Sequence, residues 1–291
     1  MTALVGETAA RPRRPTLLAR LLHNPLGLLG LGLTLLVTLL ALLAPVLAPG
    51  GPLEQDISAQ LRPPSAAHWL GTDQFGRDTL VRILYGYRAS LGVSLGAVLV
   101  AALLGGSLGV LAAYVGGWTD RLIMRLMDVL LAFPVILLAI GIVAVLGQGT
   151  LNTALAIGIV YLPSFARLMR GPALVLRGSE FVSAAGALGA GDGRIIFRHI
   201  VPNITAVLLV QTSLALSTAI LVEASLSFLG LGTRPPQPSL GLMLAEARAF
   251  LSIQPWPALV SGLAILLASL GFNLLGDSLR DLLDPRLRGR A

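Results

Sequence analysis

The chain has 291 residues, of which 55% are hydrophobic and only 12% are charged, and its net charge is +7. A soluble domain carries roughly a quarter charged residues, so this composition predicts a membrane protein and argues against a nucleic-acid partner. The sequence contains no cysteine, which excludes disulfides and Cys-based metal sites. It also contains no lysine, so a P-loop is absent, and any ATP that powers the protein must be hydrolysed by another chain.

The charge-free stretches that are long enough to cross a membrane are 26–48, 89–119, 129–166, 199–222 and 249–276. Because 26–48 is longer than the apolar part of a signal peptide, we predict a retained first span. The stretch 129–166 would form a helix of about 57 Å, almost twice the thickness of a bilayer core. It also contains the turn cluster Gly147 to Asn152. We therefore predict two helices there, six spans in total, and both termini on one side.

The segment that follows the first span, 49–88, contains a helical pattern. Leu80, Ile83, Leu84 and Tyr87 fall on one helical face, which predicts an interfacial helix within 68–90. Asp73, Arg77 and Asp78 precede this pattern. They form either a ligand site or a network of mutual ion pairs.

Small residues at a spacing of four recur in the second span. Gly92 and Gly96, and Gly105 and Gly109, have the small-xxx-small spacing that lets helix backbones approach closely. The pattern favours a packed helix bundle over isolated anchors and indicates nothing about function.

Residues 178–202 are too polar to span a membrane and too long for a tight turn. Ser179 and Glu180 are typical of a helix start, and the apolar residues from Phe181 to Leu188 recur at helical spacing. Gly189 to Gly193 predicts a break, followed by a second short helix from Arg194 to His199 that ends at Pro202. Such a helix–turn–helix either docks in a groove of a partner protein or lies on the lipid headgroups.

Glu223 is the only acidic residue deep in an apolar run. Intramembrane acids are costly, so Glu223 is a candidate for the translocation path, where it would contact a peptide amine or carry a proton. A carboxyl that is paired inside the bundle, or that lies at the interface, is the alternative. The proton role would make the chain a secondary transporter, although the inverted repeats typical of that class are not evident.

An intramembrane protease is disfavoured because the histidines lie outside the spans or at their ends.

Arginine placement predicts the orientation, because cytoplasmic loops carry an excess of basic residues. With the N-terminus inside, the cytoplasmic segments hold 15 arginines and the outer loops hold 6. Both termini and the segment 178–202 are therefore predicted to be cytoplasmic.

Several motifs resemble known proteins. The segment 181–203 resembles the coupling loop of ABC importer permeases, with Ala184, Ala185, Gly189 and Pro202 in register. Ser183 stands where that motif usually has Glu, which removes a charge from the contact. Four further segments resemble the second, C-type permease subunit of dipeptide and oligopeptide importers, and the resemblance extends over about 20–288. These four segments are HWLGTDQFGRDTLVRILYGYRASLGV (68–93), YVGGWTDRLIMRLMDVLLAFP (114–134), EASLSFLGLG (223–232) and FNLLGDSLRDLLDPRLR (272–288).

The resemblance implies an all-α, six-span permease of the type I importer fold in a bacterial inner membrane. It implies a non-catalytic subunit that binds no cofactor itself, with ATP and Mg²⁺ held by partner chains. The implied partners are a second permease, two ATPase subunits and an extracytoplasmic solute-binding protein, which the outer loop Thr233 to Pro257 would face. The implied solutes are di- or oligopeptides, with nickel chelates or glutathione-type molecules as alternatives.

The resemblance also implies a division of the chain and a set of site residues. The predicted parts are a cytoplasmic tail (1–25), a first transmembrane helix (26–48), an extracytoplasmic segment with an interfacial helix (49–88), a permease core (89–279) with a coupling loop (171–202), and a C-terminal tail (280–291). The residues expected to contact the ATPase are Ser183, Ala184, Ala185, Gly189, Arg194 and Pro202. Glu223 remains the candidate for the translocation path.

Overall fold

The computed structural model describes residues 24–283, and within these residues the chain is helical, with no β-strand. The tails predicted for 1–23 and 284–291 lie outside the described residues. The helices are α2 (Pro25–Leu47), α3 (Thr79–Val100), α4 (Gly106–Val115), α5 (Gly117–Leu131), α6 (Val135–Leu146), α7 (Thr150–Arg177), α8 (Glu180–Ala187), α9 (Asp192–Ile195), α10 (Val201–Phe228), α11 (Leu240–Arg248) and α12 (Trp256–Leu283). Two π-helical turns, η2 (Ala101–Gly105) and η3 (Ile196–Ile200), join α3 to α4 and α9 to α10.

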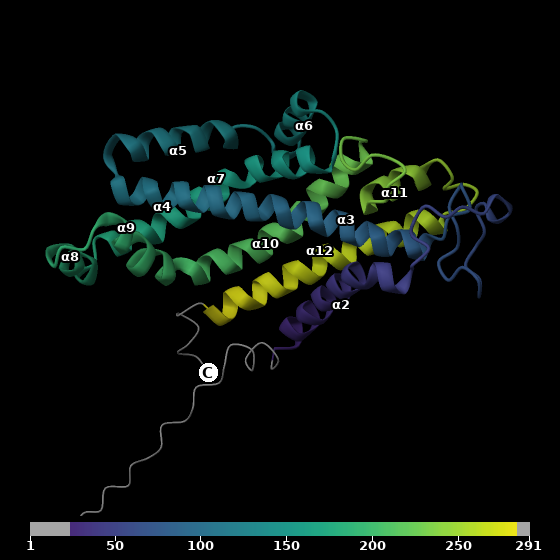
Figure 1. The fold of residues 1–291 in the computed structure, drawn as a ribbon, viewed down its shortest axis with the longest axis horizontal. Helices are drawn as coiled ribbons and strands as arrows, with labels where there is room; N and C mark the ends of the chain where they lie inside the picture. Colours follow the sequence, from purple (N-terminus) through teal and green to yellow (C-terminus); the bar gives the residue numbers. More distant parts are fainter. Residues whose placement is uncertain (1–23, 284–291) are drawn as a thin grey trace, which may run out of the picture.

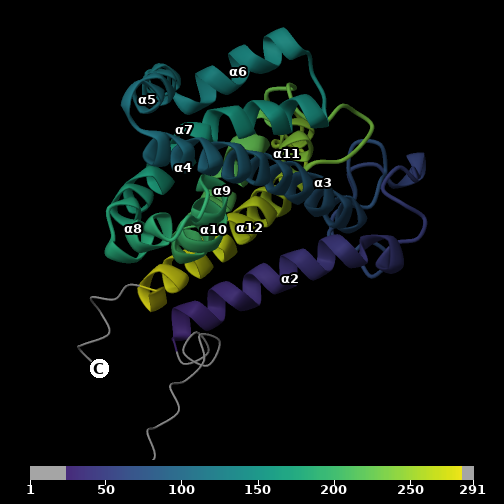
Figure 2. The ribbon, with the colours of Figure 1, turned by 60° about the vertical axis from the view of Figure 1, so that its left-hand side comes forward.

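The long helices form a bundle whose two ends carry different short elements (Figure 1). The short helices α8 and α9 lie at one end, called here the α8 end. The segment 49–78 and α11 lie at the opposite end, called here the α11 end. Both views place the start of α2 and the end of α12 on the side of α8 (Figure 2). This arrangement agrees with an even number of crossings.

Five helices of the described chain are long and apolar enough to cross a membrane: Pro25–Leu47, Thr79–Val115, Thr150–Arg177, Asp192–Phe228 and Trp256–Leu282. A sixth span is possible only if α5 and α6 count together, and that pair is bent by 96°. The predicted all-α polytopic fold is therefore confirmed, with five candidate spans in the described residues, or six if the bent pair is one span.

The stretch 129–166 is divided as predicted at its glycines but also at a second place. α6 ends at Leu146 and α7 begins at Thr150, and both Gly147 and Gly149 have positive φ (88° and 142°). The first half is not one helix from residue 129, because α5 begins at Gly117 and ends at Leu131. Pro134 causes this second break, since proline lacks an N–H and disfavours helical backbone in the residue before it.

The interfacial helix predicted within 68–90 is instead the beginning of a long helix that runs from Thr79 to Val115. Asp78 caps its start by accepting a hydrogen bond from the backbone N–H of Val81 (3.1 Å). The apolar face that suggested a lipid surface is covered by protein: Leu84 is buried, and Tyr87 donates a hydrogen bond to the Ala264 carbonyl of α12 (3.1 Å). The predicted interfacial helix is therefore continuous with the second span and not separate from it.

The helix predicted to end at Pro202 does not end there. A continuous helical run extends from Asp192 to Phe228, and Pro202 occupies the first turn of α10. The π-helical turn Ile196–Ile200 directly precedes this turn. Such a turn changes the hydrogen-bonding register, so that the missing N–H and the ring of Pro202 are accommodated within the helix.

The central core lies between α3, α7 and α10, with residues such as Ala97, Ile157 and Ala219 fully buried. Only one of the two predicted glycine pairs serves close packing. A Cβ added at Gly105 would lie 2.5 Å from the Leu162 carbonyl oxygen, and one at Gly109 would overlap the backbone of Ala166, both on α7. Gly92 and Gly96 have no such neighbour within 4 Å.

Candidate functional site

The predicted coupling loop forms a short helix, α8, followed by a glycine turn. Ser179 precedes the helix as predicted, but its hydroxyl donates back to the Leu176 carbonyl (2.5 Å) instead of capping the helix start. At the other end the N–H of Ala190 donates to the Ala185 carbonyl (3.0 Å), and Gly189 has a φ of 84°. These bonds form a Schellman motif, in which the left-handed residue is nearly always glycine. The role of Gly189 as a turn residue is thus explained by the backbone.

A single buried side chain holds α8 on the bundle. Val182 is 5% exposed and packs in a cluster with Met169 of α7 and with Ile195 and Ile200 of the following helical run. The rest of α8 faces outward: Ser183 and Ala184 are exposed, and Ala185 is half-buried. The helix is therefore attached along one narrow face.

Apolar side chains surround this exposed helix. Leu188 is 89% exposed, Phe197 is 76% exposed and Phe181 is 45% exposed. Arg194, on α9, is also exposed, and Pro202 is exposed at the start of α10. The structure thus gathers all six predicted coupling residues at the α8 end, with Ser183 to Gly189 on one helix and turn.

Two contacts that the sequence analysis did not predict tie this segment to the bundle. The Tyr114 hydroxyl of α4 donates to Asp192 Oδ1 (2.7 Å), and Arg177 Nη1 of α7 donates to the Ala113 carbonyl (3.1 Å). A cavity of about 430 Å³ lies between them, lined also by Val115 and Val182. No sequence pattern indicated these contacts, because the partners are far apart in the chain.

Glu223 is fully buried in α10. Its Oε1 accepts a hydrogen bond from the Ser227 hydroxyl one turn later (2.6 Å), whereas its Oε2 is buried without a hydrogen-bond partner. The Ser90 hydroxyl of α3 accepts a bond from the backbone N–H of Leu240, at the start of α11 (3.3 Å). Glu223 does not line the cavity beside Thr79, the cavity at Gly51 or the cavity beside Tyr114. These contacts favour a carboxyl paired inside the bundle over a residue of an open path.

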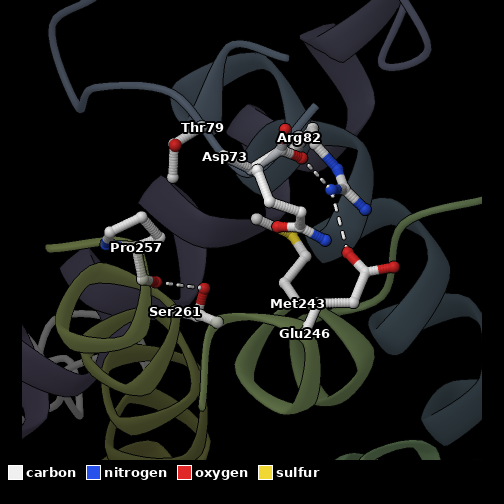
Figure 3. A pocket seen from close by; sticks show the side chains of 9 residues that line it. Asp73, Thr79, Arg82, Met243, Glu246, Pro257 and Ser261 are labelled. Carbon is white, nitrogen blue, oxygen red and sulfur yellow. Dashed lines mark hydrogen bonds and ion pairs between the residues drawn. The ribbon is translucent and has the colours of Figure 1, made fainter. Parts of the chain in front are cut away.

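A buried group of charges lies at the α11 end (Figure 3). Asp73 Oδ2 accepts hydrogen bonds from Arg77 Nε (2.7 Å) and from Arg82 Nη1. Glu246 Oε2, on α11, accepts from Arg77 Nη2 (3.3 Å) and from Arg82 Nη1 (3.0 Å). The two arginine side chains are only 3% and 2% exposed. We call these four residues the charge cluster.

The predicted ion-pair network among Asp73, Arg77 and Asp78 is correct only in part. Asp73 and Arg77 do pair, but Asp78 instead contacts His68 (2.9 Å) and caps α3. Arg82 and Glu246 complete the cluster and were missed. Glu246 is 164 residues away from Arg82 in the chain, so only the fold brings them together.

Among residues 24–283 no group of three or more His, Asp or Glu side chains is placed to hold a metal ion. The described chain offers instead several apolar helices of membrane-crossing length, with an exposed short helix at one end and the buried charge cluster at the other. These features define a helical, multi-span membrane protein.

Comparison with known proteins gives the family. Residues 105–289 match the family described as "Binding-protein-dependent transport system inner membrane component", and residues 16–64 match the N-terminal transmembrane domain of oligopeptide transport permease C. The chain belongs to this family of ABC importer permeases, as its motifs predicted.

Curated relatives extend the similarity over nearly the whole chain. The dipeptide transport system permease protein DppC of Alkalihalophilus pseudofirmus is 47% identical over 281 residues, covering 97% of this chain and 92% of the relative. The DppC protein of Haemophilus influenzae is 44% identical, covering 91% and 92%. The glutathione transport system permease protein GsiD of Pectobacterium atrosepticum is 51% identical over 225 residues, covering 77% and 75%.

Proposed function

We propose that this permease forms one half of the translocation path of an ATP-driven importer for di- or oligopeptides, and that α8 couples it to a cytoplasmic ATPase. The proposal rests mainly on one observation: a short helix at the end of the bundle buries only Val182 and presents small and apolar side chains to the outside. Small residues such as Ala184 permit a helix to lie close in the groove of a partner.

The character of this surface supports an apolar contact in preference to an ionic one. Phe181, Leu188 and Phe197 would be poorly placed in water, and large exposed apolar side chains that cluster mark interaction sites. Ser183 supplies no charge where the resembling motif has Glu. Arg194 supplies the positive charge at the edge of the same surface.

In this proposal the α8 end faces the cytoplasm and the α11 end faces the outside, as the arginine distribution predicts. A second permease chain would complete the path, two ATPase subunits would hold ATP and Mg²⁺, and an extracytoplasmic binding protein would deliver the solute. ATP binding would close the ATPase pair and move α8 with it, so that the two permeases switch from inward- to outward-facing. Hydrolysis would restore the inward-facing state.

Two classes of solute follow from the relatives. The DppC proteins are named for dipeptides and GsiD for glutathione, which is itself a modified tripeptide. We propose short peptides as the solute because the dipeptide relatives match over more of the chain. Glutathione is the alternative.

The function can be tested by reconstitution into lipid vesicles with the second permease, the ATPases and the binding protein. Radiolabelled dialanine and radiolabelled glutathione serve as probes. We expect ATP-dependent accumulation of dialanine that requires the binding protein. Accumulation driven by a proton gradient without the ATPase chains would overturn the proposal, and ATP-driven accumulation of glutathione alone would overturn the solute assignment.

The coupling role of α8 can be tested with Ala184→Trp. The side chain is exposed in this chain, so the fold should persist, while the added bulk should reduce ATPase binding by about tenfold or more because it fills the docking groove. Co-purification of the ATPase measures this effect. Ala249→Trp is the matched control, since Ala249 is exposed at the opposite end of the bundle and should leave ATPase binding unchanged. Equal ATPase binding by both variants would contradict the assignment.

A further inference from the structure

The two ends of α11 are held to the bundle by different kinds of contact. At its start, the N–H of Leu240 bonds to Ser90, and Gly241 lies so close to α10 that an added Cβ would overlap the Ala224 carbonyl. Leu240 and Met243 are buried beside these contacts. The start of α11 is thus fixed by close backbone packing, which admits little movement.

At the other end of α11 charge contributes to the attachment. Glu246 contacts Arg77 and Arg82, and Ala247 beside it is buried, whereas Arg248 and Ala249 are exposed. Arg248 lies over the Phe228 ring at 5.8 Å, near the outer limit of a cation–π contact. The polar attachment at this end is therefore mainly Glu246.

Within the charge cluster, Asp73 is held much more firmly than Glu246. Asp73 Oδ1 accepts the backbone N–H groups of Phe75 (2.8 Å) and Arg77 (3.0 Å), and its Oδ2 accepts from both arginines. Glu246 is bonded only through Oε2, and its side chain, 17% exposed, is the most exposed of the four. If the cluster separates, Glu246 is the member that leaves.

Arg82 is incompletely paired, and this is unusual for so buried a cation. Its Nη1 is shared between the two carboxylates, while Nε and Nη2 have no hydrogen-bond partner. A guanidinium pairs best when two parallel N–H groups meet one carboxylate. The nearby cavity, of about 10 Å³, is lined by Thr79, Met243 and Glu246 and holds at most about one water molecule. The arrangement therefore leaves a buried cation that movement of α11 would uncover to water (Figure 3).

We propose that the charge cluster is a releasable latch, which holds the C-terminal end of α11 against α3 and from which Glu246 departs during transport. The inference rests on the proposed function for its cycle, but the latch itself is a property of this chain alone. A purely structural seam would be served as well by apolar side chains, since buried ion pairs add little net stability. Ion pairs do permit release, because water can hydrate the separated charges.

The holding role is testable on the purified full chain in lipid, without any partner. Glu246→Ala should accelerate backbone hydrogen exchange at residues 245–249 by about tenfold, while exchange at 240–243 stays unchanged, because only the latched end loosens. Arg248→Ala is the matched control: it removes a charge from the same helix end but not from the cluster, and it should have a much smaller effect. Unchanged exchange in Glu246→Ala would overturn the latch.

The release is testable by crosslinking, since the natural chain has no cysteine. The pair Arg82→Cys and Glu246→Cys removes one charge of each sign and leaves the Asp73–Arg77 ion pair in place. In the complete transporter, joining these cysteines with a reducible bifunctional thiol reagent should lower the ATP hydrolysis stimulated by binding protein about tenfold, and reduction should restore it.

A matched crosslink shows whether the effect is specific to the latch. Ser217 and Ser269 face each other across α10 and α12, with their hydroxyl oxygens 3.0 Å apart, so Ser217→Cys and Ser269→Cys should join without loss of activity. If the transporter crosslinked between positions 82 and 246 keeps its full stimulated ATP hydrolysis, Glu246 does not need to leave the charge cluster during transport, and the proposed release is overturned. A transporter that is inactive before crosslinking would instead contradict the proposed function, and the exchange experiment would still decide the latch.

Discussion

Arginine serves opposite purposes at the two ends of this permease. At the α8 end Arg194 and Arg198 are exposed beside Phe197 and Leu188, so charge and apolar surface are both presented outward. At the α11 end Arg77 and Arg82 are turned inward onto carboxylates. Under the proposed function the α8 end would be completed by another chain, whereas the α11 end is closed by its own side chains. A change at one end should therefore affect assembly, and a change at the other should affect stability.

The largest expected effect that separates the two ends is on stability. Arg82→Ala would leave Asp73 and Glu246 with a single arginine in a buried site, which should lower the free energy of unfolding by about 3–5 kcal/mol. Arg194→Ala removes an arginine side chain from the exposed α8 end. It should change the free energy of unfolding by no more than about 0.5 kcal/mol. Denaturant unfolding of the purified chain in detergent measures both. Equal losses in the two variants would remove the distinction between the ends.

A smaller effect is expected at the α8 end from its glycine turn. Gly189→Ala places a Cβ on a residue with a φ of 84°, which costs about 1–2 kcal/mol even though no neighbour lies within 4 Å. The last turn of α8 should fray, and hydrogen exchange at 185–190 should quicken. Gly193→Ala is the control, because Gly193 also has open space around it and no positive φ. If hydrogen exchange at 185–190 is unchanged in Gly189→Ala, the stability of α8 does not depend on this turn.

The smallest effect is expected between the two ends, at Glu223. Glu223→Gln keeps an oxygen that can accept from Ser227, so ATP-driven uptake should change by less than about twofold. Uptake of dialanine by the reconstituted transporter measures this. A complete loss of dialanine uptake would instead indicate that Glu223 belongs to the translocation path. It would also favour the proton-coupled alternative.

The sequence was most informative where a feature is local. The glycine turn after α8 and the break at Gly147–Gly149 follow from residues that favour positive φ, and both were predicted correctly. The start of α8 at Glu180 was also predicted. The candidate spans could be found by comparing the length of each apolar stretch with the thickness of a bilayer core, because that length is read directly from the sequence.

The features that were missed depend on contacts between distant segments. The charge cluster needs Glu246 beside Arg82, and Tyr114 meets Asp192 across 78 residues. Close packing of α2 on α12 was also missed: a Cβ added at Gly30 would lie 2.6 Å from the Leu275 nitrogen, yet Gly30 has no distinctive spacing in the sequence. Glycine spacing alone could not distinguish Gly105 from Gly92, because the partner helix decides which glycine is needed.

Two boundaries were predicted at positions through which the structure continues the helix. A proline (Pro202) and a charged residue (Arg88) were taken as boundaries, whereas the helical runs Asp192–Phe228 and Thr79–Val115 extend through them. The local signal did not decide the boundary at either position. Pro134 lies at the break between α5 and α6, whereas Pro163 and Pro172 lie within α7.

The unbroken run from Asp192 to Phe228 has a mechanical consequence. At 1.5 Å per residue its 37 residues form a rod of about 55 Å. If such a rod pivots by about 5° at one tip, the other tip is displaced by roughly 5 Å, the rise of a single helical turn. Such a pivot would transmit a displacement at the α8 end of the rod directly to the residues beneath Gly241, without successive rearrangements of side chains.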